Sequence, residues 1–191
     1  MLIFDHVTFS YEKKEILSDF SFTLEKGEIL AIMGPSGLGK STVLNLAAGL
    51  LKPQSGEIQC HASKISYAFQ EPRLFPWMTA INNVNAVLSA KKETLPLAMQ
   101  ALSFVGLADS AKLYPHELSG GMKSRVSLAR AIAYDGDLYL LDEPFAALDK
   151  ELRQKLSADL RQYIKERGAS ALFITHQQED AEQFADRILA L

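Results

Sequence analysis

The feature that most constrains this chain is the stretch of residues 34–41, Gly-Pro-Ser-Gly-Leu-Gly-Lys-Ser. It follows an apolar run at residues 29–33 and leads into a segment with helical character at residues 41–50. A G-x-x-x-x-G-K-S/T pattern between a strand and a helix is typical of a loop whose backbone N–H groups surround phosphate oxygens. The start of the following helix adds partial positive charge. The sequence therefore predicts that the phosphates of a nucleotide bind at the end of a strand.

Each position of this phosphate loop has an expected role. Gly34, Gly37 and Gly39 allow the backbone to curl around the phosphates. Lys40 can reach the outer phosphates as a point charge, and the Ser41 hydroxyl can ligate the accompanying Mg²⁺. The other residues that we expect to line the nucleotide are Pro35, Ser36, Leu38 and Thr42. A Gly-rich turn matches the pattern by chance in on the order of one such chain in a hundred, so nucleotide binding is our working hypothesis.

Composition and charge indicate an ordinary soluble domain. The 191 residues are 48% hydrophobic and 23% charged, so the chain can bury one sizeable core. A formal net charge of -3 argues against a general nucleic-acid-binding surface, which would need an excess of Lys and Arg. The single cysteine, Cys60, excludes an intramolecular disulfide, and no apolar run approaches the ~20 residues that span a bilayer. We therefore expect a cytosolic protein. If it works at a membrane, another chain must bind it there.

Apolar runs and helical patterns alternate along the chain. Short, continuous apolar runs are typical of strands buried on both faces of a parallel sheet, and they lie at residues 29–33, 138–141 and 171–175. Helical periodicity lies at residues 41–50, 121–134 and 149–167. Alternation of apolar and polar side chains, at residues 2–10 and 20–24, indicates a half-exposed antiparallel edge. We expect an α/β nucleotide-binding core with a mainly parallel sheet and an antiparallel β edge.

The middle of the chain is different, because strand-like runs disappear there. Residues 80–90 and 97–105 show helical periodicity, with breaks at Pro96, Gly106 and Pro115. We therefore expect a single domain over residues 1–191. Its α/β core comprises residues 1–76 and 119–191, and residues 77–118 form an inserted helical subdomain.

Two adjacent acidic residues end the apolar run at residues 138–141. Neighbouring side chains on a strand point to opposite sides, so Asp142 and Glu143 can serve different tasks. We expect Asp142 to bind Mg²⁺ and Glu143 to act as general base toward the attacking water. The alternative is that Asp-Glu-Pro only terminates a strand, and the phosphate loop earlier in the chain disfavours it.

Two glycines follow a helix-capping serine at residues 119–121. Ser119 is a good N-cap residue, whereas Gly120 and Gly121 inside a helix are each unfavourable by roughly 1 kcal/mol relative to Ala. A sequence that accepts this cost usually needs its backbone to approach something closely. Backbone N–H groups at such a helix start can bind phosphate oxygens. Because the chain already has one phosphate loop, we expect this second anion site to serve a nucleotide held by another copy.

Taken together, these motifs resemble those of the ATP-binding subunits of ABC transporters over essentially the whole chain. They occur in the family's order: Tyr11, residues 34–41, Gln70, residues 119–121, residues 138–143, Asp149 and His176. The segments 69–79 and 116–122 are most similar to importer ATPases of the nitrate/sulfonate/taurine group. Two residues depart from the family pattern, Met122 where many relatives have Gln and Leu38 where a smaller residue is usual, and neither change removes a catalytic group.

The resemblance implies a role for each remaining motif residue. Tyr11 would stack on the adenine, and Gln70 would sense the metal and the attacking water. Asp149 would contribute to the nucleotide site from the segment that follows Asp142 and Glu143. His176 would lie near the γ-phosphate, so that Glu143, His176 and Gln70 form the catalytic set.

The resemblance also implies partners. It predicts a head-to-tail dimer, with itself or a similar ATPase, that holds two ATP and Mg²⁺ between the phosphate loop of one copy and residues 119–122 of the other. This dimer would drive a transmembrane permease at the cytoplasmic face of the membrane, fed indirectly by a substrate-binding protein, and import a small anion or small organic solute. We expect residues 75–78, Phe-Pro-Trp-Met, to contact the permease; the alternative is that they pack inside the helical subdomain. Because the sequence ends at Leu191, we expect no regulation through a long C-terminal extension.

Two other functions compete with this prediction. The first is a soluble ABC-type ATPase that acts on nucleic acid or the ribosome. That class would be expected to carry a long coiled-coil insertion or two fused ATPase halves. The second is a nucleotide-sensing switch without useful hydrolysis, which the presence of both Glu143 and His176 disfavours.

Overall fold

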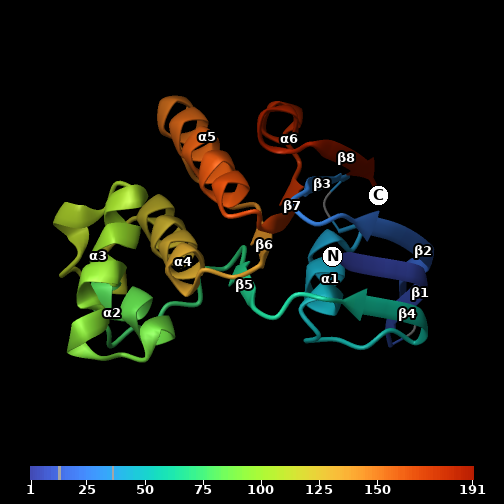
Figure 1. Ribbon diagram of the computed structural model, residues 1–191, viewed down its shortest axis with the longest axis horizontal. Helices are drawn as coiled ribbons and strands as arrows, with labels where there is room; N and C mark the ends of the chain where they lie inside the picture. The colour runs from blue at the N-terminus through green and yellow to red at the C-terminus, as the bar shows by residue number, and fades with distance from the viewer. Residues whose placement is uncertain (13, 36) are drawn as a thin grey trace.

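Five parallel strands form the central sheet of the molecule (Figure 1). The computed structural model describes residues 1–12, 14–35 and 37–191, so Ser36 of the phosphate loop lies outside the described residues. The strand order is β5-β6-β7-β3-β8. Their bounds are β3 Ile29–Met33, β5 Ile65–Ala68, β6 Leu138–Asp142, β7 Ser170–Thr175 and β8 Arg187–Ala190.

The inner strands of this sheet are buried on both faces. Along β3, Ile29 and Ala31 join one hydrophobic core, while Leu30 and Ile32 join the core on the opposite face. The same alternation holds for β6 and β7. A strand with two buried faces needs apolar side chains at successive positions, which is why these segments are continuous apolar runs. The predicted parallel α/β sheet is confirmed.

A second, antiparallel sheet covers one face of the first. Its order is β2-β1-β4, with β1 Leu2–Tyr11, β2 Lys14–Leu24 and β4 Ser55–Cys60. Helix α1 (Lys40–Ala47) packs between the two sheets, where Val43 and Leu44 are fully buried. The antiparallel edge predicted from residues 2–10 and 20–24 is therefore confirmed as β1 and β2.

The remaining helices contribute to the core on the other side of the parallel sheet. They are α2 Ala80–Asn85, α3 Leu95–Phe104, α4 Gly120–Tyr134, α5 Lys150–Glu166 and α6 Gln178–Phe184. Single 3-10 turns occupy Ala86–Leu88, Lys92–Thr94, Ala108–Ser110 and Pro115–Glu117. In Figure 1, α2 and α3 lie farthest from the strands, with α4 between them and the sheet. No helix among the described residues has both the length and the apolar character needed to cross a membrane.

The two expected helices of this region are separate, but the second begins before Pro96 and not after it. Helix α3 begins at Leu95, and Pro96 occupies its first turn. The first N–H groups of a helix have no intrahelical acceptor, so a proline there loses no hydrogen bond and its fixed φ suits the helix. The predicted helix at residues 80–90 is also shorter than expected, because α2 ends at Asn85 and a 3-10 turn follows.

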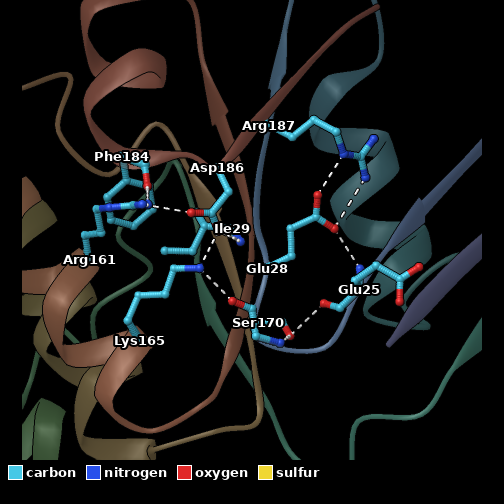
Figure 2. A network of polar contacts seen from close by, with 10 residues as sticks. Glu25, Glu28, Ile29, Arg161, Lys165, Ser170, Phe184, Asp186 and Arg187 are labelled. Atoms are coloured by element: carbon cyan, nitrogen blue, oxygen red, sulfur yellow. Dashed lines mark hydrogen bonds and ion pairs between the residues drawn. The ribbon is translucent and has the colours of Figure 1, made fainter.

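A polar network around Asp186 joins the ends of several elements (Figure 2). The Asp186 carboxylate accepts hydrogen bonds from the Ile29 N–H and from Arg161, each at 2.8 Å, and it also pairs with the Lys165 ammonium. In return, the Asp186 N–H donates to the Ile29 carbonyl at 2.8 Å. This one carboxylate thus ties α5 and the start of β8 to the first residue of β3.

We expect Asp186→Ala to lower the free energy of unfolding by about 1–2 kcal/mol, because it removes the acceptor of the Ile29 N–H and one of the acceptors of the partly exposed Arg161 and Lys165. Burial alone would raise the pKa of Asp186, but hydrogen bonds from Lys165, Ile29 and Arg161 outweigh burial and hold that pKa below its ordinary value. The carboxylate therefore stabilises the fold above about pH 4, and this contribution disappears as the pH falls through the lowered pKa.

Urea unfolding of wild type, Asp186→Ala and Asp186→Asn at neutral and acidic pH measures this effect. The exposed Asp109→Ala is the matched control and should leave stability within about 0.5 kcal/mol. The difference between wild type and Asp186→Asn should shrink on acidification. A constant difference across this pH range would contradict a stabilising role for the charged form.

Candidate functional site

A cavity of about 290 Å³ lies beside the phosphate loop, at the carboxyl ends of the parallel strands. In open α/β sheets this edge is where ligands bind. The predicted site residues that line the cavity are Tyr11, Gly37, Gly39, Lys40, Ser41, Thr42, Gln70 and Glu143. The structure therefore brings the phosphate loop, the expected adenine-binding aromatic, the expected sensor glutamine and the expected general base to one place.

The phosphate loop turns into α1 at Gly39. Gly39 has a φ of 91° and caps α1, and a Cβ at this position would lie 2.2 Å from the Ile16 side chain. Only glycine fits this conformation next to β2. The Lys40 ammonium, whose residue is 6% exposed, donates to the carbonyl oxygens of Gly34 and Pro35, both at 2.7 Å. Lys40 is thus held on the inside of the loop, where the phosphate oxygens of a nucleotide are expected.

Asp142 ends β6 beside the start of α1. It is 5% exposed, and its Oδ1 has no hydrogen-bond partner among the described residues. Burial raises the pKa of Asp142, the Ser41 hydroxyl within hydrogen-bonding reach opposes that rise, and the nearby Glu143 adds to it. A buried carboxylate oxygen without a donor, next to a serine hydroxyl, is a suitable pair of oxygen ligands for Mg²⁺. Ser41 and Asp142 therefore fit the expected metal site.

No three His, Cys, Asp or Glu side chains converge in the described part of the chain in a way that could hold a metal by themselves. Mg²⁺ commonly takes only one or two protein oxygens and completes its shell with substrate phosphates and water. Gln70 lies with Ser41 and Asp142 on the wall of an adjoining cavity of about 400 Å³. All the residues predicted to contact the metal thus share one wall.

Glu143 and His176 meet because their strands are neighbours. Strands β6 and β7 pair in parallel, and the two side chains follow their carboxyl ends. His176 Nδ1 lies 3.2 Å from Glu143 Oε2. Glu143 has a φ of 48°, and its N–H donates to the Ile174 carbonyl at 3.0 Å. A left-handed backbone at a residue other than glycine is strained, and here it directs a carboxylate toward the cavity.

Ser119, Gly120 and Gly121 lie at the start of α4 and do not line this cavity. Ser119 caps the helix by accepting a hydrogen bond from the Met122 N–H at 3.2 Å. A Cβ at Gly121 would lie 2.6 Å from the Ala147 carbonyl oxygen, so this glycine permits close packing within the chain. A Cβ at Gly120 would meet no described atom within 4 Å, so its backbone faces open space. The role of these residues toward a second copy stays a prediction.

Asp149 also lies away from the cavity. It caps α5, where its carboxylate accepts a hydrogen bond from the Leu152 N–H at 3.0 Å. This contact gives Asp149 a structural role within the chain, and its expected part in the nucleotide site stays a prediction. The exposed Leu38 lies on the phosphate loop, and the partly buried Met122 packs against the core.

Sequence reasoning missed several residues of the site. Ile16 and Ile174 line the cavity, and Ile174 could have been found because it lies near the end of β7, two residues before the predicted His176. Arg153 donates to the Leu148 carbonyl at 3.0 Å and contacts Gln177, joining the two loops beside Glu143. An arginine on a helix gives no sequence signal for this link, because Gln177 lies 24 residues away in the chain.

Residues 17–146 match the family model described as ABC transporter. The Taurine import ATP-binding protein of Pelagibacter ubique is 39% identical over 94% of this chain and 72% of its own length. The Fe(3+) ions import ATP-binding protein of Haemophilus influenzae is 37% identical over 93% of this chain and 55% of its own length. The Sulfate/thiosulfate import ATP-binding protein of Escherichia coli K12 is 38% identical over 95% of this chain. The chain spans little more than half the length of the iron and sulfate relatives.

Solved structures resemble the chain over its whole length. A dimeric ATP-binding cassette in a post-hydrolysis state, bound to ADP and Pi, superposes with a TM-score of 0.92 at 30% identity. This match covers 100% of the present chain and 94% of the cassette. A dimeric bacterial ABC transporter cassette gives a TM-score of 0.94 at 30% identity, again over 100% of this chain.

Proposed function

The chain belongs to the ABC transporter family, and on that basis we propose that it is the ATP-binding and ATP-hydrolysing subunit of an importer. The observation that carries this proposal is the convergence of three features on one cavity. These are the phosphate loop, Ser41 beside the buried Asp142, and the Glu143–His176 contact at 3.2 Å. Phosphate binding, metal binding and water activation are the functions that ATP hydrolysis requires.

The proposed mechanism assigns one task to each group. The loop N–H groups and Lys40 bind the phosphates, while Ser41 and Asp142 would hold Mg²⁺. When bound, Mg²⁺ neutralises charge on the phosphate oxygens. Glu143 accepts a proton from the attacking water, and its contact with His176 holds the carboxylate in place.

We expect Lys40→Ala to weaken ATP binding by at least about tenfold and to reduce ATPase activity in proportion. The substitution removes a charge that faces the phosphates in both the ground state and the transition state. Titration with a fluorescent ATP analogue and a steady-state phosphate-release assay measure the two effects. Lys52→Ala removes the same charge from an exposed position and is the matched control. Unchanged affinity in Lys40→Ala would refute the phosphate site.

The functional unit in this proposal is a head-to-tail dimer of this chain or of this chain with a similar ATPase. Two observations support it: Gly120 exposes its backbone at the start of α4, and the structural relatives described above are dimeric cassettes. In such a dimer, the α4 N-terminus of each copy closes the ATP site of the other. Ser119, Gly120 and Gly121 would then contact phosphate oxygens in trans.

A membrane permease is the proposed partner. An apolar cavity of about 460 Å³ lies beside the segment 75–78 and includes Phe75 in its wall. Trp77 is 69% exposed, and its ring centroid lies 5.5 Å from that of Phe75. Exposed aromatic side chains next to an apolar groove are common at protein interfaces. Binding there would hold the chain at the cytoplasmic face of the membrane, with a substrate-binding protein acting indirectly through the permease.

The cargo is proposed only as a class. The relatives described above are named as import proteins for taurine, sulfate or thiosulfate, and Fe(3+). A further relative, 38% identical over 97% of this chain, is the Spermidine/putrescine import ATP-binding protein of Hahella chejuensis. The resemblance to the taurine relative favours a small anion or a small organic solute. Since all these relatives are import ATP-binding proteins, they favour an importer over a soluble ATPase acting on nucleic acid or the ribosome.

A further inference from the structure

One wall separates the metal-site cavity from the apolar groove. Tyr67, Phe69 and Arg73 line both the cavity of about 400 Å³ that contains Ser41 and the groove of about 460 Å³. The Tyr67 and Phe69 rings are stacked, with centroids 3.8 Å apart and planes at 17°. The Arg73 guanidinium covers the Phe69 ring at 4.3 Å from its centroid. The wall is therefore a continuous stack of planar groups.

Among the described residues, one side-chain hydrogen bond joins this stack to α1, the helix that follows the phosphate loop. The Tyr67 hydroxyl donates to Asn45 Oδ1 at 3.1 Å. Asn45 lies four residues after Ser41 on α1, so the two side chains share one face of the helix. At the other end, Gln70 directly follows the stacked Phe69.

The bond therefore spans the two sides of the proposed metal site. Ser41 is on the α1 side with Asn45, and Gln70 is on the β5 side with Tyr67. Strand β5 is at the edge of the parallel sheet and pairs only with β6 among the described strands. The segment that leads to Gln70 thus has sheet support on one side, and the Tyr67–Asn45 bond holds it against α1 on the other.

We propose that Tyr67 is a positioning residue, which through its hydrogen bond to Asn45 sets the separation of Gln70 from Ser41 and hence the affinity of the site for Mg²⁺. The inference rests on the proposed function, because Ser41 and Gln70 are metal-contacting residues only in that function. It predicts that loss of the hydroxyl alone affects metal-dependent steps and spares the binding of metal-free nucleotide.

The test is the effect of Mg²⁺ on ATP affinity, which needs no turnover. A fluorescent ATP analogue is titrated in EDTA and in excess Mg²⁺. The ratio of the Kd in EDTA to the Kd in Mg²⁺ is then compared between wild type and Tyr67→Phe. Phenylalanine keeps the ring and its stack on Phe69. Because the change removes one hydrogen bond, we expect the ratio to fall about threefold to tenfold while the Kd in EDTA stays the same.

Two further variants distinguish positioning from general destabilisation. Asn45→Ala should reproduce the effect, and the double variant should be no worse than either single one, because both remove the same bond. Tyr139→Phe is the control, because it removes another buried hydroxyl, which contacts Asp135 at 3.4 Å. Tyr139 lies near the N-terminal end of β6, away from Asp142, so this variant should leave the ratio unchanged. Thermal unfolding of all variants shows whether they are folded.

The outcomes separate this inference from the proposed function. If wild type fails to bind ATP, or binds it equally well with and without Mg²⁺, the proposed function fails and this inference fails with it. If wild type depends on Mg²⁺ and Tyr67→Phe retains the same ratio, only the positioning role is overturned. Additive effects of Tyr67→Phe and Asn45→Ala would also overturn it.

Discussion

We expect Glu143→Gln to bind ATP with nearly unchanged affinity and to lose about 10²–10⁴-fold in turnover. The amide keeps the size of the side chain but cannot accept a proton from the attacking water. In the structure the carboxylate lines the cavity that we propose binds ATP, and its Oε2 lies 3.2 Å from His176 Nδ1. Because ATP then remains uncleaved, the ATP-bound dimer should also live longer.

Steady-state ATPase assays and size-exclusion chromatography with ATP measure these two effects. Glu57→Gln makes the same chemical change at an exposed position of β4 and should behave as wild type. Wild-type turnover together with an unchanged dimer lifetime in Glu143→Gln would refute its assignment as the general base.

We expect Ser119→Arg to reduce ATPase activity to near background, although this residue lines no part of the cavity in its own chain. A long cation at the start of α4 would remove the Ser119 cap and block the approach of a second copy's nucleotide. The loss should be in trans, which mixing with Lys40→Ala protein can test. In the mixed dimer both changes fall on one site, and the other site is intact.

Random mixing of the two inactive proteins should therefore restore up to about a quarter of wild-type activity, since half of the dimers are mixed and each has one intact site. Ser103→Arg, on the exposed face of α3, is the matched control and should retain activity. Full activity of the Ser119→Arg protein alone would contradict a role in trans. Loss of its folded state, measured by thermal unfolding, would instead assign Ser119 to the stability of α4.

Much of the fold could be predicted because burial leaves a sequence pattern. Strands β3, β6 and β7 lie between two cores and are apolar throughout, so they stand out from their surroundings. Strand β4 was not predicted, because it is an exposed edge strand whose residues Ser55–Cys60 are mostly polar. Strand β5 was not predicted either, because it is only 4 residues long and its apolar pattern is interrupted by the buried Ser66. The Ser66 hydroxyl accepts a hydrogen bond from the Gly136 N–H.

The site could be predicted as a set of residues but not as an arrangement. The motif identified Lys40, but its two carbonyl contacts depend on the loop conformation. The Glu143–His176 contact depends on β6 and β7 being neighbours, which no local pattern specifies. The close approach predicted from the glycines at 120 and 121 exists for Gly121, yet within the chain it is to the Ala147 backbone.

The position of β3 in its sheet constrains the order of events during synthesis. Strand β3 and the phosphate loop leave the ribosome early, but both neighbours of β3 come from residues 170–190. Contacts between such distant segments form late and slowly. Until then β3 is an unpaired apolar segment, and the loop has no rigid strand to anchor it. Nucleotide can therefore assist folding only after residues 170–190 have emerged.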